Sequence, residues 1–329
     1  MKEDEIRKRD VLNRYLELVK IDAEVIFSDK STFQSLPCPA CGSDRYESQF
    51  DKSGFHYVQC MDCDTLFVNP RPIYENLMQI YTDSPSTKFW VEEFFLPMAE
   101  ARREKIFRPR AQYITEKFPQ LRTGVIGDIG AGFGIFSEEM KQTWPDANIV
   151  AIEPSVDMAM ICRNKGLTVL ESTMENVDPL CHQFDLLTAF ELFEHLHNPV
   201  VFAEKACKLL KSGGYLYLTT LNGLGFDIQL LWERSKSVTP PHHLNFFNPH
   251  SIRMLLEKMG FTLIEVSTPG QLDWDIVEGG FLQEALDPGR FFRTVSKYGS
   301  VQAKKDLQFW TSSNNFSSHM GVVAQKNRQ

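Results

Sequence analysis

Four of the seven cysteines form two Cys-x-x-Cys pairs, Cys38 with Cys41 and Cys60 with Cys63, and eighteen residues separate the pairs. Zinc binds thiolates tetrahedrally, and each pair can occupy one edge of the tetrahedron while the segment between the pairs returns the chain as a hairpin. A redox-active pair would open a helix, and neither pair is placed in that way. The spacing therefore predicts a structural zinc site with four thiolate ligands.

A glycine-rich turn follows a short apolar segment in the middle of the chain. Its glycines are Gly130, Gly132 and Gly134, and Asp128 lies two residues before the first of them. Glycine lets the backbone turn tightly and approach a ligand closely. A dinucleotide fingerprint needs a small residue immediately after the last glycine, where this chain has Ile135, and this argues against NAD and FAD.

A second apolar segment, 148–152, ends in Glu153, about twenty residues beyond the turn. An acidic side chain at this place can accept the hydrogens of both ribose hydroxyls. Strand, glycine turn, helix, strand and acid together predict a βαβ unit that binds a nucleoside. A dehydrogenase would have to bind nicotinamide despite the bulky residue in the turn.

The sequence from Asp128 to Gly134, followed by Glu153, resembles the class I S-adenosylmethionine-dependent methyltransferases. Two further blocks are similar to that family, 184–196 as its fourth strand and turn, and 209–218 as its helix, Gly-Gly turn and fifth strand. The resemblance implies an α/β fold with a Rossmann-like seven-stranded sheet and S-adenosylmethionine as cofactor. The residues that it assigns to the cofactor are Asp128, Gly130, Gly132, Phe133, Gly134, Glu153, Pro154, Thr173, Met174, Phe190 and Glu191.

The fourth strand of this resemblance delivers Glu191, Glu194 and His195, which would lie on one face if a helix continued from the strand. With His243 from a later loop they could bind a hard divalent cation. Metal-assisted 2′-O-methyltransferases of RNA ends and some quinone O-methyltransferases are similar in this respect, but family members without a metal also carry Glu-His-Leu here. A second interpretation is metal-free catalysis in which Glu191 assists and His195 or His243 is the base. A third is that the histidines only pack.

The chain divides into four predicted segments. Residues 1–35 form an N-terminal helix, 36–72 resemble a zinc ribbon in which His56 is a surface residue, and 73–120 form a helical linker or lid. Residues 121–329 form the methyltransferase domain, with a helical insertion at 268–316 between strands six and seven. Its aromatic residues predict either a cap over the substrate or a separate small core.

Five basic residues follow one another in the predicted lid. They form either a solvated helix face or a clamp for an anionic acceptor, and they are Arg102, Arg103, Lys105, Arg108 and Arg110.

Composition limits the function classes. The chain has 329 residues, 43% of them hydrophobic, and a net charge of −8, so we expect a folded globular protein and not a general nucleic-acid binder. No apolar run is long enough for a membrane span, and the first residues lack the apolar core of a signal peptide. A cytoplasmic protein is therefore expected.

These observations predict methyl transfer from S-adenosylmethionine to a small-molecule acceptor. Methyltransferases fused to zinc ribbons resemble enzymes that modify bacterial sugars, which favours a hydroxyl of a sugar or sugar conjugate, and the basic residues of the lid favour an anionic conjugate. One alternative is C-methylation of a nucleotide sugar. Another, from a different class, is a non-catalytic scaffold whose ribbon binds RNA or protein.

Overall fold

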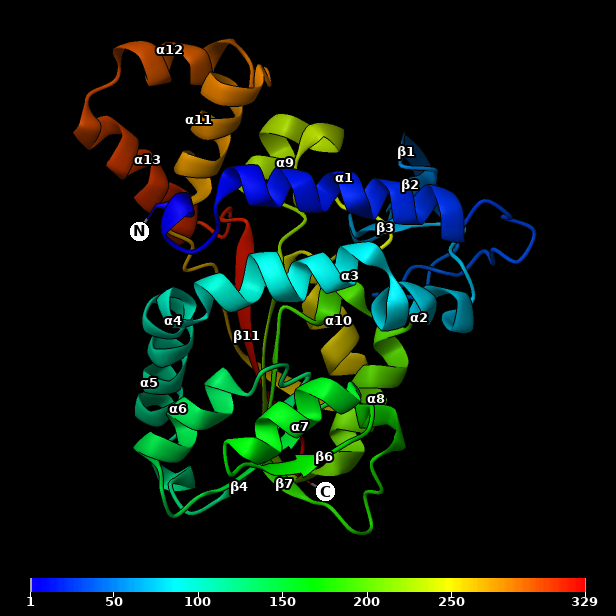
Figure 1. Cartoon of the computed structure of the whole chain (residues 1–329), viewed down its shortest axis with the longest axis vertical. Coiled ribbons are helices and arrows are strands. Elements are labelled where there is room, and N and C mark those ends of the chain that lie inside the picture. The colour runs from blue at the N-terminus through cyan, green and yellow to red at the C-terminus, as the bar shows by residue number, and fades with distance from the viewer. Residues whose placement is uncertain (1, 329) are drawn as a thin grey trace. The chain divides into compact units, whose positions relative to one another are not determined.

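The computed structural model describes residues 2–328 (Figure 1). The chain forms two compact units. Unit 1 contains Met1–Pro97, Thr220–Ile252 and Val266–Gly321, and unit 2 contains Met98–Thr219, Arg253–Glu265 and Val322–Gln329. Several elements begin in one unit and end in the other, among them β8 (Leu210–Leu221), α10 (Pro249–Lys258), β10 (Phe261–Ser267) and β11 (His319–Lys326).

Unit 2 is built on a seven-stranded sheet with the strand order β10-β11-β8-β7-β4-β5-β6. Its other strands are β4 (Val125–Ile129), β5 (Asn148–Ile152), β6 (Thr168–Leu170) and β7 (Phe184–Phe190). β4 pairs in parallel with both β5 and β7, so the carboxyl ends of these strands meet at one edge of the sheet. The predicted α/β fold with seven strands is confirmed.

The helices of unit 2 pack on this sheet through apolar stripes. Ile114 and Phe136 are buried in one cluster with Ile126 of β4 and Leu186 of β7, so α5 and α6 contact the sheet. The elements are α4 (Ala99–Arg102), η4 (Arg103–Phe107), α5 (Arg108–Lys117), η5 (Pro119–Leu121), α6 (Ile135–Thr143), α7 (Val156–Asn164), η6 (Met174–Asn176), η7 (Phe193–His195) and α8 (Pro199–Leu209).

The helical linker or lid expected over 73–120 is broken into short pieces beyond residue 85. Before α4 it contains α3 (Pro85–Phe89), η2 (Trp90–Phe95) and η3 (Leu96–Met98). η2 and η4 are π-helical. Pro97 and Pro109 lack the N–H that a continuous α-helix uses, which gives a physical reason for the interruptions.

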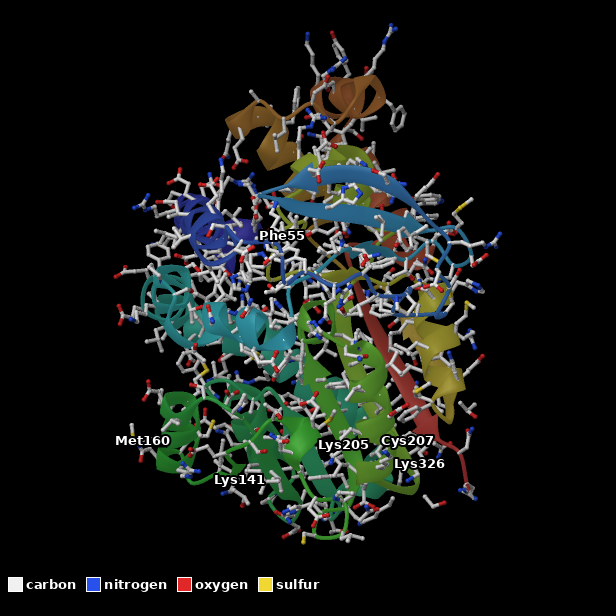
Figure 2. All side chains as sticks on the ribbon, turned by 90° about the vertical axis from the view of Figure 1, so that its right-hand side faces the viewer. Phe55, Lys141, Met160, Lys205, Cys207 and Lys326 are labelled. Atoms are coloured by element: carbon white, nitrogen blue, oxygen red, sulfur yellow. The ribbon has the colours of Figure 1, made fainter. Side chains whose placement is uncertain are left out.

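Unit 1 contains a four-stranded sheet in the order β1-β2-β3-β9. Its strands are β1 (Tyr46–Lys52), β2 (Phe55–Cys60), β3 (Leu66–Val68) and β9 (Asn245–Phe246). Ser53 and Gly54 join the first two strands, and both have the positive φ of a tight hairpin turn, 46° and 81°. Phe55, labelled in Figure 2, is buried against Phe27 with 5.3 Å between ring centroids.

The two units and the four predicted segments divide the chain differently. β9 lies in the predicted methyltransferase domain, yet it pairs with β3 of the ribbon, with Leu66 opposite Phe246. Both side chains are buried in one apolar cluster with Tyr57 and Leu77. The ribbon therefore shares a core with residues that follow it by about 180 positions, and a short two-sided hairpin has too few apolar residues to form such a core alone.

Several helices of unit 1 contribute apolar residues to this core, among them Ala23, Leu77 and Ile228. Leu12, Val19 and Ala23 form the buried stripe of α1, at helical spacing. The elements are η1 (Glu3–Glu5), α1 (Arg9–Ile26), α2 (Tyr74–Asp83), α9 (Phe226–Leu231), η8 (Trp232–Arg234), α11 (Asp273–Glu284), α12 (Arg290–Tyr298) and α13 (Val301–Ser313). Among the described residues, no helix combines the length and the apolar character that a membrane span requires.

The helices α11, α12 and α13 occupy the segment between β10 and β11 (Figure 1). Trp274 and Phe292 stack at 4.3 Å in a small core with Leu231 and Val277. The insertion therefore has a separate apolar core within unit 1. However, of the five aromatic residues on which the predicted cap or small core rests, only Phe292 is buried; the others are Phe281, Phe291, Phe309 and Trp310.

Candidate functional site

The glycine turn follows the carboxyl end of β4 and contains three glycines in the left-handed conformation. The φ angles of Gly130, Gly132 and Gly134 are 66°, 56° and 68°. A Cβ at Gly134 would lie 2.7 Å from Leu167 and 2.8 Å from the Cys162 sulfur, whereas a Cβ at Gly132 would meet nothing within 4 Å. Gly134 is thus required by packing, and Gly132 lines open space in which a ligand can approach the backbone.

We expect alanine at these two positions to separate binding from folding. Gly134→Ala should lower the unfolding free energy by about 2–4 kcal/mol, because overpacking adds to the left-handed strain. Gly132→Ala should cost only about 1 kcal/mol of stability. It should nevertheless weaken binding of S-adenosylhomocysteine by roughly ten- to a hundredfold, since the methyl group fills the ligand's space. Urea unfolding and calorimetric titration measure the two effects. Equal losses of stability in both variants would contradict this assignment.

Glu153 fastens the end of β5 to the glycine turn. One carboxylate oxygen accepts the N–H of Gly132 at 2.7 Å, and the other accepts the N–H of Ser155 at 2.9 Å. Burial raises the pKa of Glu153, although these two hydrogen bonds oppose the rise. Each carboxylate oxygen has more than one acceptor direction, so the group can hold the turn and also accept a ribose hydroxyl.

Asp128 lies beneath the turn, with its carboxylate bonded to protein hydroxyls. It accepts hydrogen bonds from Ser137 Oγ at 2.8 Å and from Thr188 Oγ1 at 3.0 Å, which ties β4 to α6 and β7. Burial raises the pKa of Asp128 to about 7, against the effect of both hydrogen bonds. The geometry makes this residue a support of the turn.

The raised pKa predicts a stability change with pH. An aspartate in an unfolded chain titrates near pH 3.9, so between about pH 4 and 7 the folded protein holds a proton that the unfolded chain has released. This contribution to stability is present below pH 4 and is lost as the pH rises to 7. Asp128→Asn removes this contribution. The unfolding free energy of the variant minus that of the wild type should therefore rise by about 2–4 kcal/mol between about pH 4 and 7.

Urea unfolding at pH 4.5, 6.0 and 7.5 measures that difference. Ser137→Ala is the matched control, because it removes one hydrogen bond and keeps the carboxylate. A difference between Asp128→Asn and wild type that stays constant across the three pH values would contradict the assignment.

Glu191 follows β7 in a strained conformation, with a φ of 48°. Its N–H donates to the Thr219 carbonyl at 3.0 Å, and its Oε1 accepts Thr219 Oγ1 at 2.8 Å and Arg110 Nη2 at 2.5 Å. The Arg110 guanidinium also lies 4.7 Å from the ring centroid of Phe190. Arg110 is one of the five basic residues that follow one another in the predicted lid, and nothing in their spacing marks the one that pairs beside the strand ends.

The expected helical continuation after β7 is wrong. The turn η7 is a 3-10 helix of three residues that starts at Phe193, and Glu191 lies before it. Glu194 is buried and His195 is half-buried in this turn. Because of the left-handed residue, Glu191, Glu194 and His195 do not share one α-helical face.

Two of the basic residues of the predicted lid are engaged with carboxylates of α6. Arg103 pairs with Glu138 at 2.8 Å and with Glu139 at 2.9 Å, and Arg108 Nε pairs with Glu139 at 2.9 Å. Although burial opposes ionisation, the hydrogen bonds from Arg108 and Arg103 hold the pKa of Glu139 below its usual range. These contacts favour a structural role for Arg103 and Arg108, in anchoring η4 and α5 to α6.

The remaining predicted cofactor residues lie in unit 2 near the same strand ends. Phe133 is buried within the turn, and Pro154 is exposed after β5. Thr173 precedes the 3-10 turn η6, in which Met174 is buried.

His243 belongs to unit 1, in the segment before β9. Its Nδ1 lies 2.5 Å from the Ser237 carbonyl, and the Tyr57 hydroxyl donates to the His243 carbonyl at 2.8 Å. A carbonyl only accepts, so Nδ1 carries the proton in the neutral ring and Nε2 is the basic nitrogen. The neighbouring His242 stacks on Tyr15 at 6.0 Å, and burial lowers the pKa of His242 to about 3. His243 is therefore the better candidate for a base.

The four cysteines come together in unit 1. Cys38 Sγ lies 3.5 Å from Cys63 Sγ, Cys41 Sγ lies 3.5 Å from Cys60 Sγ, and all four sulfurs lie within 4.8 Å of one another. A zinc ion with Zn–S bonds of about 2.3 Å requires sulfurs about 3.8 Å apart. Hydrogen bonding between Cys38 and Cys63 raises the pKa of the Cys38 thiol and lowers that of Cys63 to about 5. The donor set fits zinc.

The backbone repeats itself around the two cysteine pairs. Gly42 N–H donates to the Cys38 carbonyl at 2.9 Å, and Asp64 N–H donates to the Cys60 carbonyl at 3.0 Å. Gly42 and Asp64 both have positive φ, 82° and 56°. Two matching turns present their thiols to one centre, which is the arrangement that a four-thiolate site requires.

The family described as "Methyltransferase domain" matches residues 98–266, just over half of the chain. The chain belongs to this methyltransferase family. Together with the strand order and the glycine turn, this identifies a methyltransferase that uses S-adenosylmethionine, and it confirms the resemblance found in the sequence.

Relatives of this methyltransferase include the "Ubiquinone biosynthesis O-methyltransferase" of Xanthomonas euvesicatoria pv. vesicatoria (strain 85-10). The two sequences are 26% identical over 171 residues, and the alignment covers 48% of this chain and 70% of that protein. A protein of the same name from Vibrio cholerae serotype O1 (strain M66-2) is 28% identical over 120 residues, covering 34% of this chain and 48% of that protein. The structure is also similar to the solved structure of the plantazolicin methyltransferase BpumL in complex with a monoazolic desmethylPZN analog and SAH. The TM-score is 0.51 and the sequence identity is 15%, and the superposition covers 77% of this chain and 94% of that chain. This likeness shows a common fold.

Proposed function

We propose that this methyltransferase transfers a methyl group to a hydroxyl of a small-molecule acceptor. The observation that carries the proposal is the half-buried imidazole of His195 just beyond the carboxyl end of β7. β7 pairs in parallel with β4, and the glycine turn follows β4, so the imidazole and the turn lie at the same edge of the sheet. A hydroxyl loses a proton during transfer, and an imidazole is suited to accept it near neutral pH. Relatives named O-methyltransferases support this reaction type.

We assign the donor to the following residues of unit 2. Gly130, Gly132 and Gly134 would form the turn, in which the open space at Gly132 would admit the donor to the backbone, and Glu153 would accept the ribose hydroxyls. Thr173, Met174 and Phe133 would line the adenine, with Pro154 at its rim. Phe190 and Glu191 would border the methionine part of the donor, beside Arg110, whose guanidinium can bind a carboxylate.

Transfer from a sulfonium is an in-line displacement. The bond between the acceptor oxygen and the methyl carbon forms as the bond between carbon and sulfur breaks, and the positive charge of the donor supplies most of the activation. The protein has to align the acceptor oxygen, exclude water and receive the proton at an imidazole nitrogen of His195 or His243. A divalent metal at Glu191, Glu194, His195 and His243 remains the alternative, in which the metal would lower the pKa of the acceptor hydroxyl. Glu191 is then less available, because its carboxylate already pairs with Arg110.

We propose a sugar or sugar conjugate as the acceptor class, and a structural zinc ion at Cys38, Cys41, Cys60 and Cys63. The matching turns and the spacing of the sulfurs support the zinc ion. The sugar rests on the resemblance to zinc-ribbon methyltransferases that modify sugars, so its test has to include other hydroxyls.

Titration of S-adenosylhomocysteine into the purified chain tests the donor site, and we expect micromolar binding. Incubation with methyl-labelled donor and a panel of sugar and aromatic hydroxyl acceptors then tests the reaction. The proton and carbon NMR chemical shifts of the product distinguish an O-methyl from a C-methyl group. A C-methyl group would favour C-methylation of a nucleotide sugar. Absence of donor binding to folded protein would contradict an enzyme and favour the scaffold that binds RNA or protein.

A further inference from the structure

The helical insertion of unit 1 exposes large apolar side chains that its own core does not use. Phe291 and Tyr298 of α12 are each 73% exposed, and on α13 Val301 is 72%, Phe309 71% and Trp310 52% exposed. Isolated apolar residues on a surface are common, but five in twenty residues are not. Their concentration points to an interaction surface.

The exposed residues of α12 share one face. At about 100° per residue, Arg290, Phe291, Lys297 and Tyr298 fall within an arc of about 120°. The opposite side of α12 contributes Phe292, which stacks on Trp274. This helix therefore already has a core side, and its second aromatic side faces outward.

The helix α13 repeats this arrangement. Val301, Lys305 and Phe309 follow one another at intervals of four residues on its outer side. Its inner side holds Lys304, which bonds to Glu278 at 2.6 Å, and the buried Thr311. Only two residues, Gly299 and Ser300, separate α12 from α13.

The outer side of α12 is basic, although the chain is acidic, whereas the outer side of α13 carries both Lys305 and Asp306, which are exposed. Residues 286–316 contain five basic residues and two acidic ones, whereas the whole chain has a net charge of −8. Arg293 pairs with Asp287, and Lys304 with Glu278. Within residues 2–328, Arg290 and Lys305 form no ion pair. Lys297 Nζ lies 5.0 Å from the ring centroid of Tyr298.

We propose that this aromatic–basic face, formed by Arg290, Phe291, Lys297, Tyr298, Val301, Lys305, Phe309 and Trp310, docks on the surface of a bilayer that contains anionic lipids. Helices that lie in a membrane interface combine Phe, Trp and Leu with Lys and Arg, because the apolar groups enter the acyl boundary while the cations meet the lipid phosphates. A second copy of the chain would bring the same cations opposite one another, which opposes a symmetric dimer. Single-stranded RNA is usually held in a basic groove, whereas these side chains protrude.

Co-sedimentation with phosphatidylglycerol–phosphatidylcholine vesicles tests the proposal on the full chain. We expect binding at low salt that weakens as salt is added, and little binding to pure phosphatidylcholine vesicles. Phe291→Ser with Phe309→Ser should weaken binding by roughly tenfold or more. Arg290→Gln with Lys305→Gln should weaken binding by roughly thirtyfold, since each cation near an anionic surface contributes about 1 kcal/mol.

Leu180→Ser in unit 2 is the matched control, because this side chain is 92% exposed and lies outside the insertion. Its vesicle binding should equal that of the wild type. Binding of S-adenosylhomocysteine and the melting temperature should stay unchanged in every variant, which separates this test from that of the donor site. Failure of the wild type to bind anionic vesicles at low salt, or unchanged binding by both double variants, would overturn the proposal. A doubled mass in light scattering that the phenylalanine double variant abolishes, without vesicle binding, would assign the face to a second copy instead.

Discussion

Replacement of Cys60 by Ser is expected to abolish the proposed zinc binding of the purified protein and to unfold the ribbon of unit 1. Structural zinc contributes apparent free energies of about 10–16 kcal/mol in small zinc domains, which equals or exceeds the whole stability of many domains. Cys60 is fully buried at the end of β2, and a serine hydroxyl is a poor zinc ligand that would remain there without its metal. Zinc content and thermal unfolding, measured on the same sample, check both effects.

The unfolding should spread beyond the ribbon. β2 pairs with β3, β3 pairs with β9, and all three contribute to one apolar core with α1 and α2. We therefore expect a strong chelator, added to the wild type, to reproduce the melting behaviour of Cys60→Ser. Cys181→Ser is the control, because Cys181 is exposed and lies in unit 2. A Cys60→Ser protein that kept about one zinc per chain would contradict the four-thiolate assignment.

Local patterns explain why the glycine turn and the acid that contacts it could be predicted from the sequence. The turn from Gly130 to Gly134 and the acid at Glu153 are separated by one helix and one strand, so their spacing alone places them at neighbouring strand ends. The clustering of the four cysteines is similar, because each Cys-x-x-Cys pair is a local turn. In these places the chemistry and the fold are set by residues that are close in sequence.

Long-range pairing explains what could not be predicted. β9 has only two residues, and no period in so short a segment reveals that Phe246 completes the ribbon core. The same limit applies to Arg110 and Glu191, which are paired across 81 positions. Glu191 also has a positive φ, which is uncommon for a residue with a long side chain, and the helical prediction failed at this point.

The helical insertion shows a further limit. Phe291 and Phe292 are adjacent and identical in type, so composition cannot tell which one is buried. The structure places one against Trp274 and the other outside. An aromatic-rich helix therefore predicts a contact without saying whether the partner is the protein's own core or another surface.

Replacement of His195 by Ala is expected to lower kcat by about 10²–10⁴-fold, because it removes the general base that accepts the proton. Binding of S-adenosylhomocysteine should equal that of the wild type, since the donor site stays intact. His195→Gln should be equally slow, since an amide fills the space and cannot take up the proton. Single-turnover rates with the acceptor found in the panel, together with calorimetric titration of the product, measure the two quantities.

His182→Ala is the matched control, because this half-buried histidine of unit 2 precedes β7, whereas His195 follows it, and the variant should keep the wild-type rate. The base could instead be His243, whose Nδ1 is fixed by the Ser237 carbonyl. His243→Ala would then lose the rate and His195→Ala would stay within about twofold of the wild type. The divalent-metal alternative predicts a third result, in which mild chelation that leaves the zinc in place abolishes turnover and added magnesium or manganese restores it. In the first two outcomes a different histidine accepts the proton of the acceptor hydroxyl, and in the third a metal ion stabilises the deprotonated oxygen. One set of variants and one chelation series therefore decide among them.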